Sequence, residues 1–487
     1  MTYKTIEEGE KPKNISTINP ERSPAGHQEA AVRRKNFLEV VTGYTEDGAL
    51  AAADRCIQCK KPACITGCPV NINIKGFIHE ITKQRYEDAY RIITEANLFP
   101  SICGRVCPQE VQCEAKCLVG KRHAPVAIGY LERFVGDLAQ KNNWAETPSI
   151  KRNGKRVAVI GSGPSGLACA SDLAKAGFEV VIYEALHLPG GVLMYGIPEF
   201  RLPKGIVLRE IENLKNLGIR IETNKIIGKT HTIEELMHKH GFDAVFIGTG
   251  AGYPQSPGIK GEFLNGVMSA NEFLTRVNLM HGYDFPNHAT PVGIGHDIAV
   301  VGCGNTAMDA ARVALRLNTR NVYIVYRRTV NESPARKEEI QHAMEEGVQF
   351  IWLTAPVEIL GTPDGWIKGM RCIKLAQGEP DSKGRLTVSP ILGTEFMLDV
   401  DTVIYALGTM ANPIIGKTTA HLKLDKNGYI PVDDDTQMTS IPGVFAGGDI
   451  SKSSWSFTTV IHAMGKGRRA AKGIIDFVTH NSKLSKI

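Results

Sequence analysis

Cysteine residues are concentrated in one early segment of this chain. Eight of the 11 cysteines in the 487 residues lie between Cys56 and Cys117, in two groups. The first group reads Cys56-x2-Cys59-x4-Cys64-x3-Cys68-Pro69, and the second reads Cys103-x3-Cys107-Pro108-x4-Cys113-x3-Cys117. Thiols gathered in this way form disulfides, bind zinc, or bind iron–sulfur clusters. The spacing of the two groups helps to choose among these three chemistries.

Iron–sulfur chemistry fits the spacing better than the other two. Disulfide frameworks are typical of small secreted domains, but the polar residues before the cysteines contain no apolar signal-peptide core. Zinc sites usually read as separated CxxC pairs, and only Cys56 and Cys59 form such a pair. Cluster-binding runs of bacterial ferredoxins end in C-x3-C-P, and their last cysteine ligates the other cluster. Cys64-x3-Cys68-Pro69 has this ending.

The number of cysteines matches two clusters. By the ferredoxin geometry, Cys56, Cys59 and Cys64 would bind one cluster and Cys68 would reach a second one, with the second group completing both. Two [4Fe–4S] clusters need eight ligands, and the two groups together hold eight cysteines. The other three cysteines are isolated, and we interpret them as small buried hydrophobic residues: Cys169, Cys303 and Cys372.

A first dinucleotide-binding fingerprint follows the cysteines. Residues 155–160 form a short apolar strand pattern that leads into Gly161-Ser162-Gly163-Pro164-Ser165-Gly166 and then a helical pattern. In such a turn the first glycine allows the tight bend, the second lets the backbone approach a pyrophosphate, and the third packs helix on strand. A second strand, over residues 178–183, ends in Glu184, 18 residues after Gly166. We expect Glu184 to accept a hydrogen bond from a ribose hydroxyl.

A second fingerprint lies further along the chain and differs in charge. The strand pattern at residues 298–301 leads into Gly302-Cys303-Gly304-Asn305-Thr306-Ala307 and a helix, and a strand follows at residues 321–326. Arg327 and Arg328 stand where Glu184 stands in the first unit. An acid there would repel a 2′-phosphate, whereas two guanidinium groups would bind it. The second unit is therefore expected to bind NADP(H).

The first unit then needs another dinucleotide, and FAD is the natural candidate. In flavoproteins with two dinucleotide sites, an aspartate at a late glycine turn bonds the ribityl chain; Gly448-Asp449 has this pattern. Strand patterns at residues 243–250 and 401–408 suggest crossings out of and back into one domain. We predict a helical cluster domain at 1–150, an FAD domain at 151–285 and 401–487, and an inserted NADP domain at 286–400.

Composition narrows the class of protein. Apolar residues make up 43% of the chain and charged residues 22%, with a net charge of +6 and scattered Lys and Arg, so nucleic acid is not an expected partner. No apolar run is long enough to predict a membrane span. The alternation of strands and helices after residue 155 predicts an α/β fold, preceded by helices at residues 79–97 and 125–140. Only Cys169 lies in the first FAD segment, so no redox cysteine pair is expected beside a flavin.

These motifs together resemble a known family. The chain is similar to the small (beta) subunit of NADPH-dependent glutamate synthase, to the large subunit of NADH-dependent ferredoxin:NADP oxidoreductases, and to the N-terminal half of dihydropyrimidine dehydrogenases. Besides the cysteine groups and the first glycine turn, the matching motifs are Gly104-Arg105-Val-Cys107-Pro108-Gln109-Glu110, Gly129-Tyr-Leu-Glu132-Arg133-Phe134, Pro189-Gly190-Gly191-Val-Leu-Met-Tyr-Gly196-Ile-Pro198 and Tyr326-Arg327-Arg328. The resemblance runs from about residue 35 to the end of the chain.

The resemblance implies a different ligand set from the one that spacing suggests. In this family the second cluster takes three cysteines and one side-chain oxygen. Carried over, one cluster takes Cys56, Cys59, Cys64 and Cys117, and the other takes Cys68, Cys107, Cys113 and Glu132. Cys103 is then left out, although spacing alone does not choose between Cys103 and Glu132. The chain departs from the family pattern at Ser333, and at Trp455 and Phe457, which are expected to lie near the flavin.

The resemblance also implies an activity. Hydride would pass from NADPH to FAD, and single electrons would leave through the two clusters, with no side chain acting as nucleophile or base. The acceptor would be a larger partner subunit, as in glutamate synthase, or a soluble carrier such as ferredoxin; alternatively, the chain would act alone on soluble acceptors. A fourth possibility is an NADPH-sensing module with structural metal. Oxygen-sensitive clusters suit a reducing cytoplasm.

Overall fold

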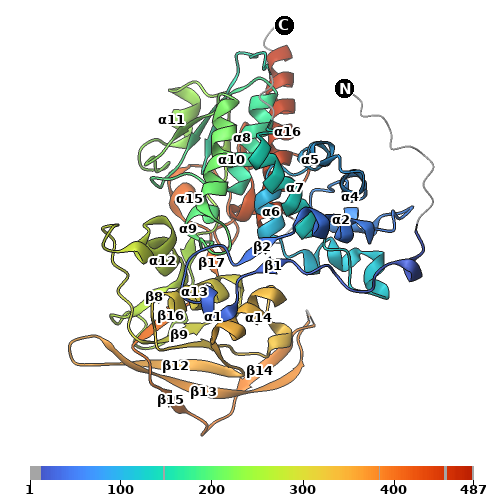
Figure 1. Ribbon diagram of the computed structural model, residues 1–487. Helices are drawn as coiled ribbons and strands as arrows, with labels where there is room; N and C mark the ends of the chain where they lie inside the picture. Colours follow the sequence, from blue (N-terminus) through green and yellow to red (C-terminus); the bar gives the residue numbers. More distant parts are fainter. Residues whose placement is uncertain (1–12, 146–148, 383, 454–457, 485–487) are drawn as a thin grey trace.

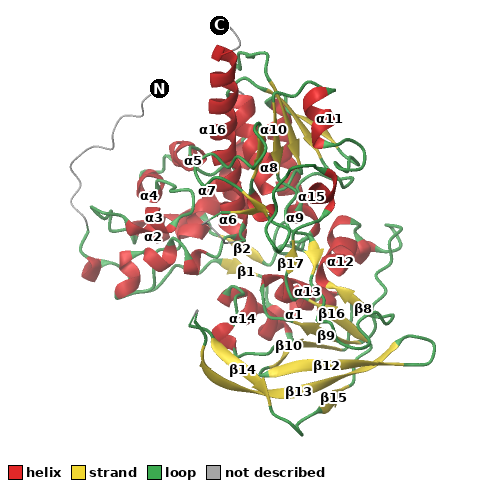
Figure 2. Cartoon of the chain, turned by 180° about the vertical axis from the view of Figure 1, so that it is seen from behind, coloured by secondary structure: helices red, strands yellow, loops and turns green. Residues whose placement is uncertain are grey.

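The computed structural model describes residues 13–145, 149–382, 384–453 and 458–484. Within them the chain forms a helical amino-terminal domain, two parallel sheets with helices, and an antiparallel sheet (Figures 1 and 2). The α/β fold class predicted from the sequence is confirmed. Among these residues no helix is long and apolar enough to span a bilayer. Trp455 and Phe457 lie outside the described residues.

The cysteine groups lie in the helical domain, between short helices rather than inside long ones. Its helices are α2 (Glu46–Asp54), α3 (Ala63–Gly67), α4 (Ile74–Thr82), α5 (Tyr86–Thr94), α6 (Pro100–Val106) and α7 (Ile128–Asn142), with 3-10 turns at Gln109–Val111, Glu114–Lys116 and Leu118–Lys121. The helix expected over residues 79–97 is interrupted at Gln84, whose φ of 57° is left-handed. An α-helix cannot continue through such a residue. The helix expected over residues 125–140 is α7, shifted by two to three residues.

The first parallel sheet holds the first fingerprint. Its strand order is β19 (Val444–Ala446), β6 (Ala244–Ile247), β3 (Arg156–Ile160), β4 (Glu179–Tyr183) and β5 (Arg220–Glu222). The central strands are almost wholly apolar, as expected when both faces of a parallel sheet are covered. Covering elements are α8 (Pro164–Lys175), α9 (Val192–Tyr195), α10 (Lys204–Asn216), α11 (Ile233–His238), α15 (Ile414–Thr418) and α16 (Val460–Leu484). The long helix α16 lies along α8 (Figure 1).

The second parallel sheet holds the second fingerprint. Its order is β11 (Gln349–Ile351), β10 (Asn321–Val325), β9 (Asp297–Val301), β16 (Thr402–Tyr405) and β8 (Val267–Ser269), with helices α12 (Ala270–Leu274), α13 (Asn305–Arg316) and α14 (Lys337–Glu346). Strands β8 and β16 pair within this sheet. The second sheet therefore includes two strands, β8 and β16, that lie outside the range 286–400 predicted for the NADP domain. Strand β16 pairs with β9 on the side opposite β10, and β8 pairs with β16.

An antiparallel sheet projects below the second unit (Figure 1). It contains β12 (Thr354–Gly361), β13 (Ile367–Pro380), β14 (Leu386–Pro390) and β15 (Phe396–Leu398). Near the start of the described chain, β1 (Gly26–His27), α1 (Ala30–Arg33) and β2 (Val41–Gly43) run between the helical domain and α14. The remaining short strands are β7 (Tyr253–Pro254), β17 (Thr409–Met410), β18 (Ile430–Pro431) and β20 (Ser451–Lys452).

Candidate functional site

The three glycines of the first fingerprint have three different environments. Gly161 has φ +96°, and a Cβ atom there would lie 2.6 Å from the carbonyl oxygen of Gly248. A Cβ at Gly166 would lie 2.0 Å from the Gly161 oxygen, so this glycine packs α8 against the turn. A Cβ at Gly163 would meet nothing within 4 Å. The backbone at Gly163 is thus open to the approach of a ligand at the start of α8, which begins at Pro164.

Glu184 lies beside this turn because of strand register. Ile160 pairs with Tyr183 across β3 and β4, so the residues that follow both strands emerge at the same edge of the sheet. The Glu184 side chain is buried; its Oε2 accepts from the Ser162 amide at 3.0 Å and its Oε1 accepts from the Leu186 amide at 2.8 Å. These bonds hold the carboxylate at the edge of the sheet where the first glycine turn lies.

Two further segments complete this part of the site. Gly191 has φ +55°, and a Cβ there would lie 2.8 Å from the Cα of Gly163. Gly448 has φ +76° and packs against Ser165, where a Cβ would lie 2.6 Å from the serine hydroxyl. Asp449 follows; burial raises the pKa of its carboxyl, and the charge of Lys466 acts in the opposite direction. Lys466 also donates to the Ser451 carbonyl at 3.2 Å.

The second fingerprint repeats the geometry of the first. Gly302 has φ +124°, and its amide donates to Val325 O at 3.0 Å, as the Gly161 amide donates to Tyr183 O at 2.8 Å. The nearest atom to a Cβ at Gly304 would be 3.9 Å away, which leaves this backbone open. Helix α13 begins directly after it, at Asn305, with Thr306 exposed and Ala307 buried. The third position therefore tolerates a methyl group here.

Arg327 and Arg328 follow the next strand, as Glu184 does in the first unit. Arg327 is exposed, and Arg328 is half-buried with its Nε donating to the Leu386 carbonyl at 3.3 Å. Ser333, further along the same loop, donates from its hydroxyl to the Cys303 carbonyl at 2.7 Å and so braces the second turn. Two positive charges thus lie at the edge of the sheet where the second glycine turn opens.

A cleft of about 760 Å³ joins the two units. Its walls include most of the residues predicted to bind dinucleotide: Gly161, Gly163, Pro164, Ser165, Glu184, Gly191, Asn305, Thr306 and Asp449. Gly166, Gly302, Gly304, Ala307, Arg327, Arg328 and Gly448 are not among its lining residues. Gly166, Ala307 and Gly448 instead have packing positions. The cleft is large enough for a dinucleotide cofactor.

The cleft also contains polar groups that fit a bound cofactor and that sequence reasoning missed. Thr249 and Tyr405 are among its lining residues, and the hydroxyl of each is buried without a hydrogen-bond partner among the described residues. Tyr195 lines it too, and burial raises the pKa of its phenol to about 12. Buried hydroxyls normally have partners. Thr249 follows strand β6, and Tyr405 ends strand β16. Both lie at the sheet edge that carries the glycine turns, and this position is the sequence signal that could have identified them.

The first cysteine set lies near the surface of the helical domain. Burial raises the pKa of the Cys56 thiol to about 11 and that of Cys64 to about 12. At Cys64 the neighbouring Cys56, Cys117 and Cys59 add to this effect, so the four thiols lie close enough to act on one another. Within the described residues, no three His, Cys, Asp or Glu side chains lie close enough together to hold one metal ion.

The second set lies deeper and includes a carboxylate. Burial raises the pKa of Cys113, and the neighbouring Glu132, Cys68 and Cys107 raise it further. Glu132 is itself buried, its pKa is raised to about 8 by burial, and its Oε1 accepts from Asn97 Nδ2 at 2.6 Å. Among the described residues, no cation offsets this carboxylate. A buried, uncompensated carboxylate beside three thiols fits an iron ligand, because a metal would supply the missing positive charge.

Cys103 has a different setting. It is fully buried, its sulfur lies 3.8 Å from the Met464 sulfur on α16, and it shares a hydrophobic core with the first dinucleotide unit. Cys107 lies in this same core, whereas Cys68 and Cys113 belong to the core of the helical domain. Cys103 is nevertheless a neighbour of Cys107, Glu132 and Cys68. It therefore lies between the second set and the dinucleotide unit.

Two protein families match successive parts of the chain. Residues 33–144 match the family described as dihydropyrimidine dehydrogenase domain II, 4Fe-4S cluster, and residues 155–467 match the pyridine nucleotide-disulphide oxidoreductase family. The glutamate synthase [NADPH] small chain of Azospirillum brasilense is 36% identical, over 93% of each chain. The beta subunit of the NADP(+)-dependent formate dehydrogenase of Moorella thermoacetica is 37% identical, over 88% of this chain and 62% of that protein.

One solved structure supports the fold. FprA from Mycobacterium tuberculosis in complex with NADPH aligns with a TM-score of 0.56 at 19% identity, covering 68% of this chain and 86% of that chain. At this level of identity the likeness is one of fold. The aligned part of this chain therefore shares its fold with FprA.

Proposed function

Since this chain belongs to the glutamate synthase small-chain family of pyridine nucleotide-disulphide oxidoreductases, we propose that it oxidises NADPH through FAD and two [4Fe–4S] clusters. The observation that carries the proposal is the composition of the cleft walls. Val106 and Pro108, which flank Cys107 in the second cysteine set, line the same cleft as Gly161 and Gly163 of the first turn and Asn305 and Thr306 at the start of α13. An electron leaving a flavin in this cleft would have the second cluster next to it.

The cofactors would divide between the two units by charge. FAD would lie on the first turn, with Glu184 on its ribose and Asp449 near its ribityl chain, and NADPH would lie on the second turn, with Arg327 and Arg328 on its 2′-phosphate. Hydride acceptance and one-electron release are the chemistry that the bound flavin supplies. The chain's own part is to hold the two dinucleotides at one cleft and to keep the deeper cluster ligands away from water.

For the clusters we propose the two ligand sets that the resemblance implies. Cys56, Cys59, Cys64 and Cys117 would bind the outer cluster, and Cys68, Cys107, Cys113 and Glu132 would bind the inner one. The mutual proximity of each set supports this division, and so does the uncompensated burial of Glu132. Cys103, which contacts Met464, would remain a thiol between the inner cluster and α16.

The electron acceptor is proposed to be a larger partner subunit, with the chain as the electron-input subunit of a glutamate synthase-like system in a reducing cytoplasm. The names "small chain" and "subunit beta" of the similar proteins favour a partner over the alternatives of a stand-alone oxidoreductase or a ferredoxin-linked one. Purification under anaerobic conditions from the source cell tests this. A stoichiometric large subunit is expected, and elution of the chain alone with full turnover would favour the stand-alone enzyme.

The cofactor content is tested on the same preparation. We expect one FAD and about eight irons with as much acid-labile sulfide per chain, since each [4Fe–4S] cluster contributes four of each. A preparation with zinc in place of iron, or with no flavin, would overturn the proposal and favour a sensing module with structural metal.

A further inference from the structure

A buried asparagine lies next to the second set of candidate cluster ligands, and the proposed function gives it no role. Asn97 is fully buried in the short loop between α5 and α6. A buried side-chain amide needs partners for its NH2 group and for its oxygen, because an unpaired polar group in the interior costs free energy. The partners that Asn97 has indicate what its side chain does.

The orientation of the Asn97 side chain is fixed by its neighbours. The backbone amide of Phe99 donates to Asn97 Oδ1 at 3.1 Å. A backbone N–H group can only donate, so the atom that faces it must be the oxygen of the side-chain amide. The Cys103 sulfur lies on the same oxygen, at 3.5 Å. The NH2 group of Asn97 therefore has to find its acceptor elsewhere.

That acceptor is the carboxylate of Glu132. Asn97 Nδ2 donates to Glu132 Oε1 at 2.6 Å, and both side chains are buried. Among the described residues, this is the only hydrogen bond to the Glu132 carboxylate, so its Oε2 is left for another partner. One oxygen of the carboxylate is thus held by an uncharged donor, and the charge of the group is still uncompensated.

The loop that carries Asn97 is held from the first dinucleotide unit. Arg468 on α16 donates to the carbonyl oxygens of Glu95 and Ala96, at 2.7 and 2.6 Å, and its Nε donates to Asp172 on α8 at 2.8 Å. Helices α16 and α8 lie along each other in that unit (Figure 1). The position of the Asn97 side chain is therefore set by contacts on both sides of the boundary between the helical domain and the dinucleotide unit.

We propose that Asn97 is a positioning residue of the inner cluster: it holds one oxygen of Glu132 so that the other is presented to the iron. This rests on the proposed function, in which Glu132 is a cluster ligand. Hydrogen-bond partners of ligating side chains orient them and affect how firmly the metal is bound. An N–H group directed at a ligand also stabilises the more negative, reduced cluster, so Asn97 makes the inner cluster easier to reduce.

Two substitutions in the holoprotein separate this role from a role in the loop. In Asn97→Ser the hydroxyl can still accept from the Phe99 amide but is too short to reach Glu132. Asn97→Leu has a similar size and loses both hydrogen bonds. Asn278→Leu is the matched control, since Asn278 is equally buried and donates to the Tyr195 carbonyl at 3.1 Å, in the π-helical turn Thr275–Leu279.

The inner cluster is followed by potentiometric titration with electron paramagnetic resonance, and by the release of iron to a chelator. Spectra of Cys64→Ala, which keeps the inner cluster alone, identify its signal. In both Asn97 variants we expect a more negative midpoint potential for the inner cluster and release of its four irons that is roughly tenfold or more faster. The signal of the outer cluster, and both signals in Asn278→Leu, should stay as in the unaltered protein.

The possible results separate this proposal from the function on which it rests. An unaltered protein without about eight irons would overturn the proposed function itself. If the irons are present, an unchanged potential and unchanged iron release in Asn97→Ser would overturn the role of Asn97. An effect in Asn97→Leu alone would also overturn it, because the asparagine would then act through the turn at Phe99. Equal iron loss in Asn278→Leu would show a general loss of stability instead.

Discussion

In the two dinucleotide units the backbone forms most of the candidate nucleotide-binding site. In the helical domain, by contrast, the candidate cluster sites consist of side chains alone. Gly161 and Gly302 share a positive φ and the same hydrogen bond to the neighbouring strand. The charge of the two units differs after the next strand, where the first unit has Glu184 and the second has Arg327 and Arg328. In the helical domain the ligands come from loops between short helices, and nine candidate side chains compete for eight ligand positions.

The difference teaches where sequence spacing is informative. A glycine turn has one backbone geometry, so its spacing specifies the site almost completely. A cluster needs only that thiols or carboxylates converge, and many spacings achieve this. Burial and neighbouring charges then become the informative quantities, as they are for Glu132 and Cys103. Four pairs of variants test this contrast.

The largest effect is expected from loss of an outer-cluster ligand. Cys64→Ala should abolish the outer cluster, lower iron by about four atoms per chain, and stop electron transfer beyond the inner cluster. Cys372→Ala, at a buried thiol on β13, is the matched control and should keep all the iron. Iron and sulfide analysis with visible spectroscopy measures both. Full iron content in the Cys64 variant would contradict the outer ligand set.

The next variants address the inner cluster. Glu132→Ala should make the inner cluster labile and lower the iron content, because it removes the only carboxylate ligand proposed. Cys103→Ala should retain about eight irons, since four ligands remain for each cluster. Electron paramagnetic resonance of the reduced protein measures the inner cluster directly. The opposite result, iron loss in the Cys103 variant alone, would return the ligand assignment to the eight cysteines.

The charge difference between the two dinucleotide units is tested by the arginines. Replacing both Arg327 and Arg328 by Ser should lower kcat/KM for NADPH roughly 10- to 100-fold and leave the value for NADH nearly unchanged, because charge-assisted bonds to the 2′-phosphate are lost. Arg320→Ser, at the opposite end of β10, is the control and should change neither value. Parallel losses with NADPH and NADH would mean that the arginines support the fold rather than recognise the phosphate.

The smallest effect concerns the third position of each glycine turn. Gly166→Ala places a Cβ against the Gly161 carbonyl and should destabilise the protein by about 1–3 kcal/mol and weaken its retention of FAD. Ala307→Gly, the reverse change in the second unit, should cost about 1 kcal/mol or less, the usual penalty of glycine in a helix. Thermal unfolding and flavin retention measure the pair. Equal effects would show that the two turns pack alike.

Much of the fold followed from local sequence patterns. Strands β3, β4 and β10 begin and end within one residue of where the apolar runs place them, because each leads into a turn or a charged strand end. The break at Gln84 was not predicted, since nothing in the helical spacing of residues 79–97 signals a left-handed residue. The pairing of β16 with β9 was not predicted either, because it joins segments about 100 residues apart.

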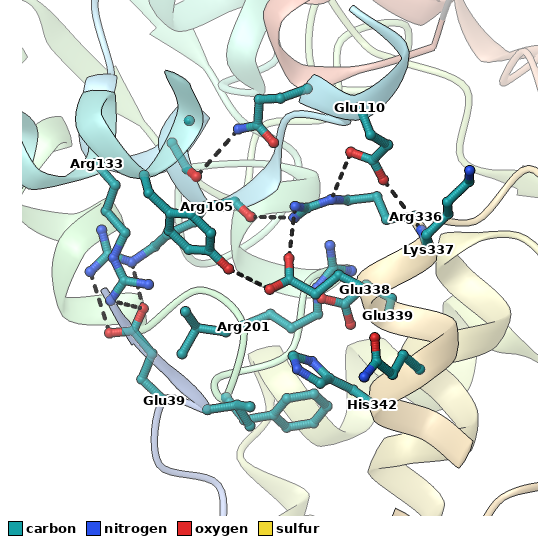
Figure 3. A pocket seen from close by; sticks show the side chains of 18 of the residues that line it. Glu39, Arg105, Glu110, Arg133, Arg201, Arg336, Lys337, Glu338, Glu339 and His342 are labelled. Carbon is teal, nitrogen blue, oxygen red and sulfur yellow. Dashed lines mark hydrogen bonds and ion pairs between the residues drawn. The ribbon is translucent and has the colours of Figure 1, made fainter. Parts of the chain in front are cut away.

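Local sequence patterns also decided which residues of the candidate site could be predicted. The glycine turns, Glu184 and Asp449 could be predicted because each is coupled to a strand end. Thr249 and Tyr405 were missed although they also end strands, since no motif marks a hydroxyl as a ligand. A smaller cavity of about 350 Å³, where the helical domain meets the two dinucleotide units, could not be predicted at all (Figure 3). It joins Glu39, Arg105, Arg201 and His342, which only the packing of three separate parts brings together.

The central claim is that NADPH, bound on the second unit, reduces a flavin bound on the first. Anaerobic stopped-flow mixing of the protein with NADPH or with NADH, followed at the flavin absorbance near 450 nm, tests it most directly. The account predicts rapid bleaching by NADPH, with cluster reduction following, and bleaching by NADH that is at least about tenfold less efficient. Equal efficiency of the two nucleotides, or no bleaching by either, would contradict it.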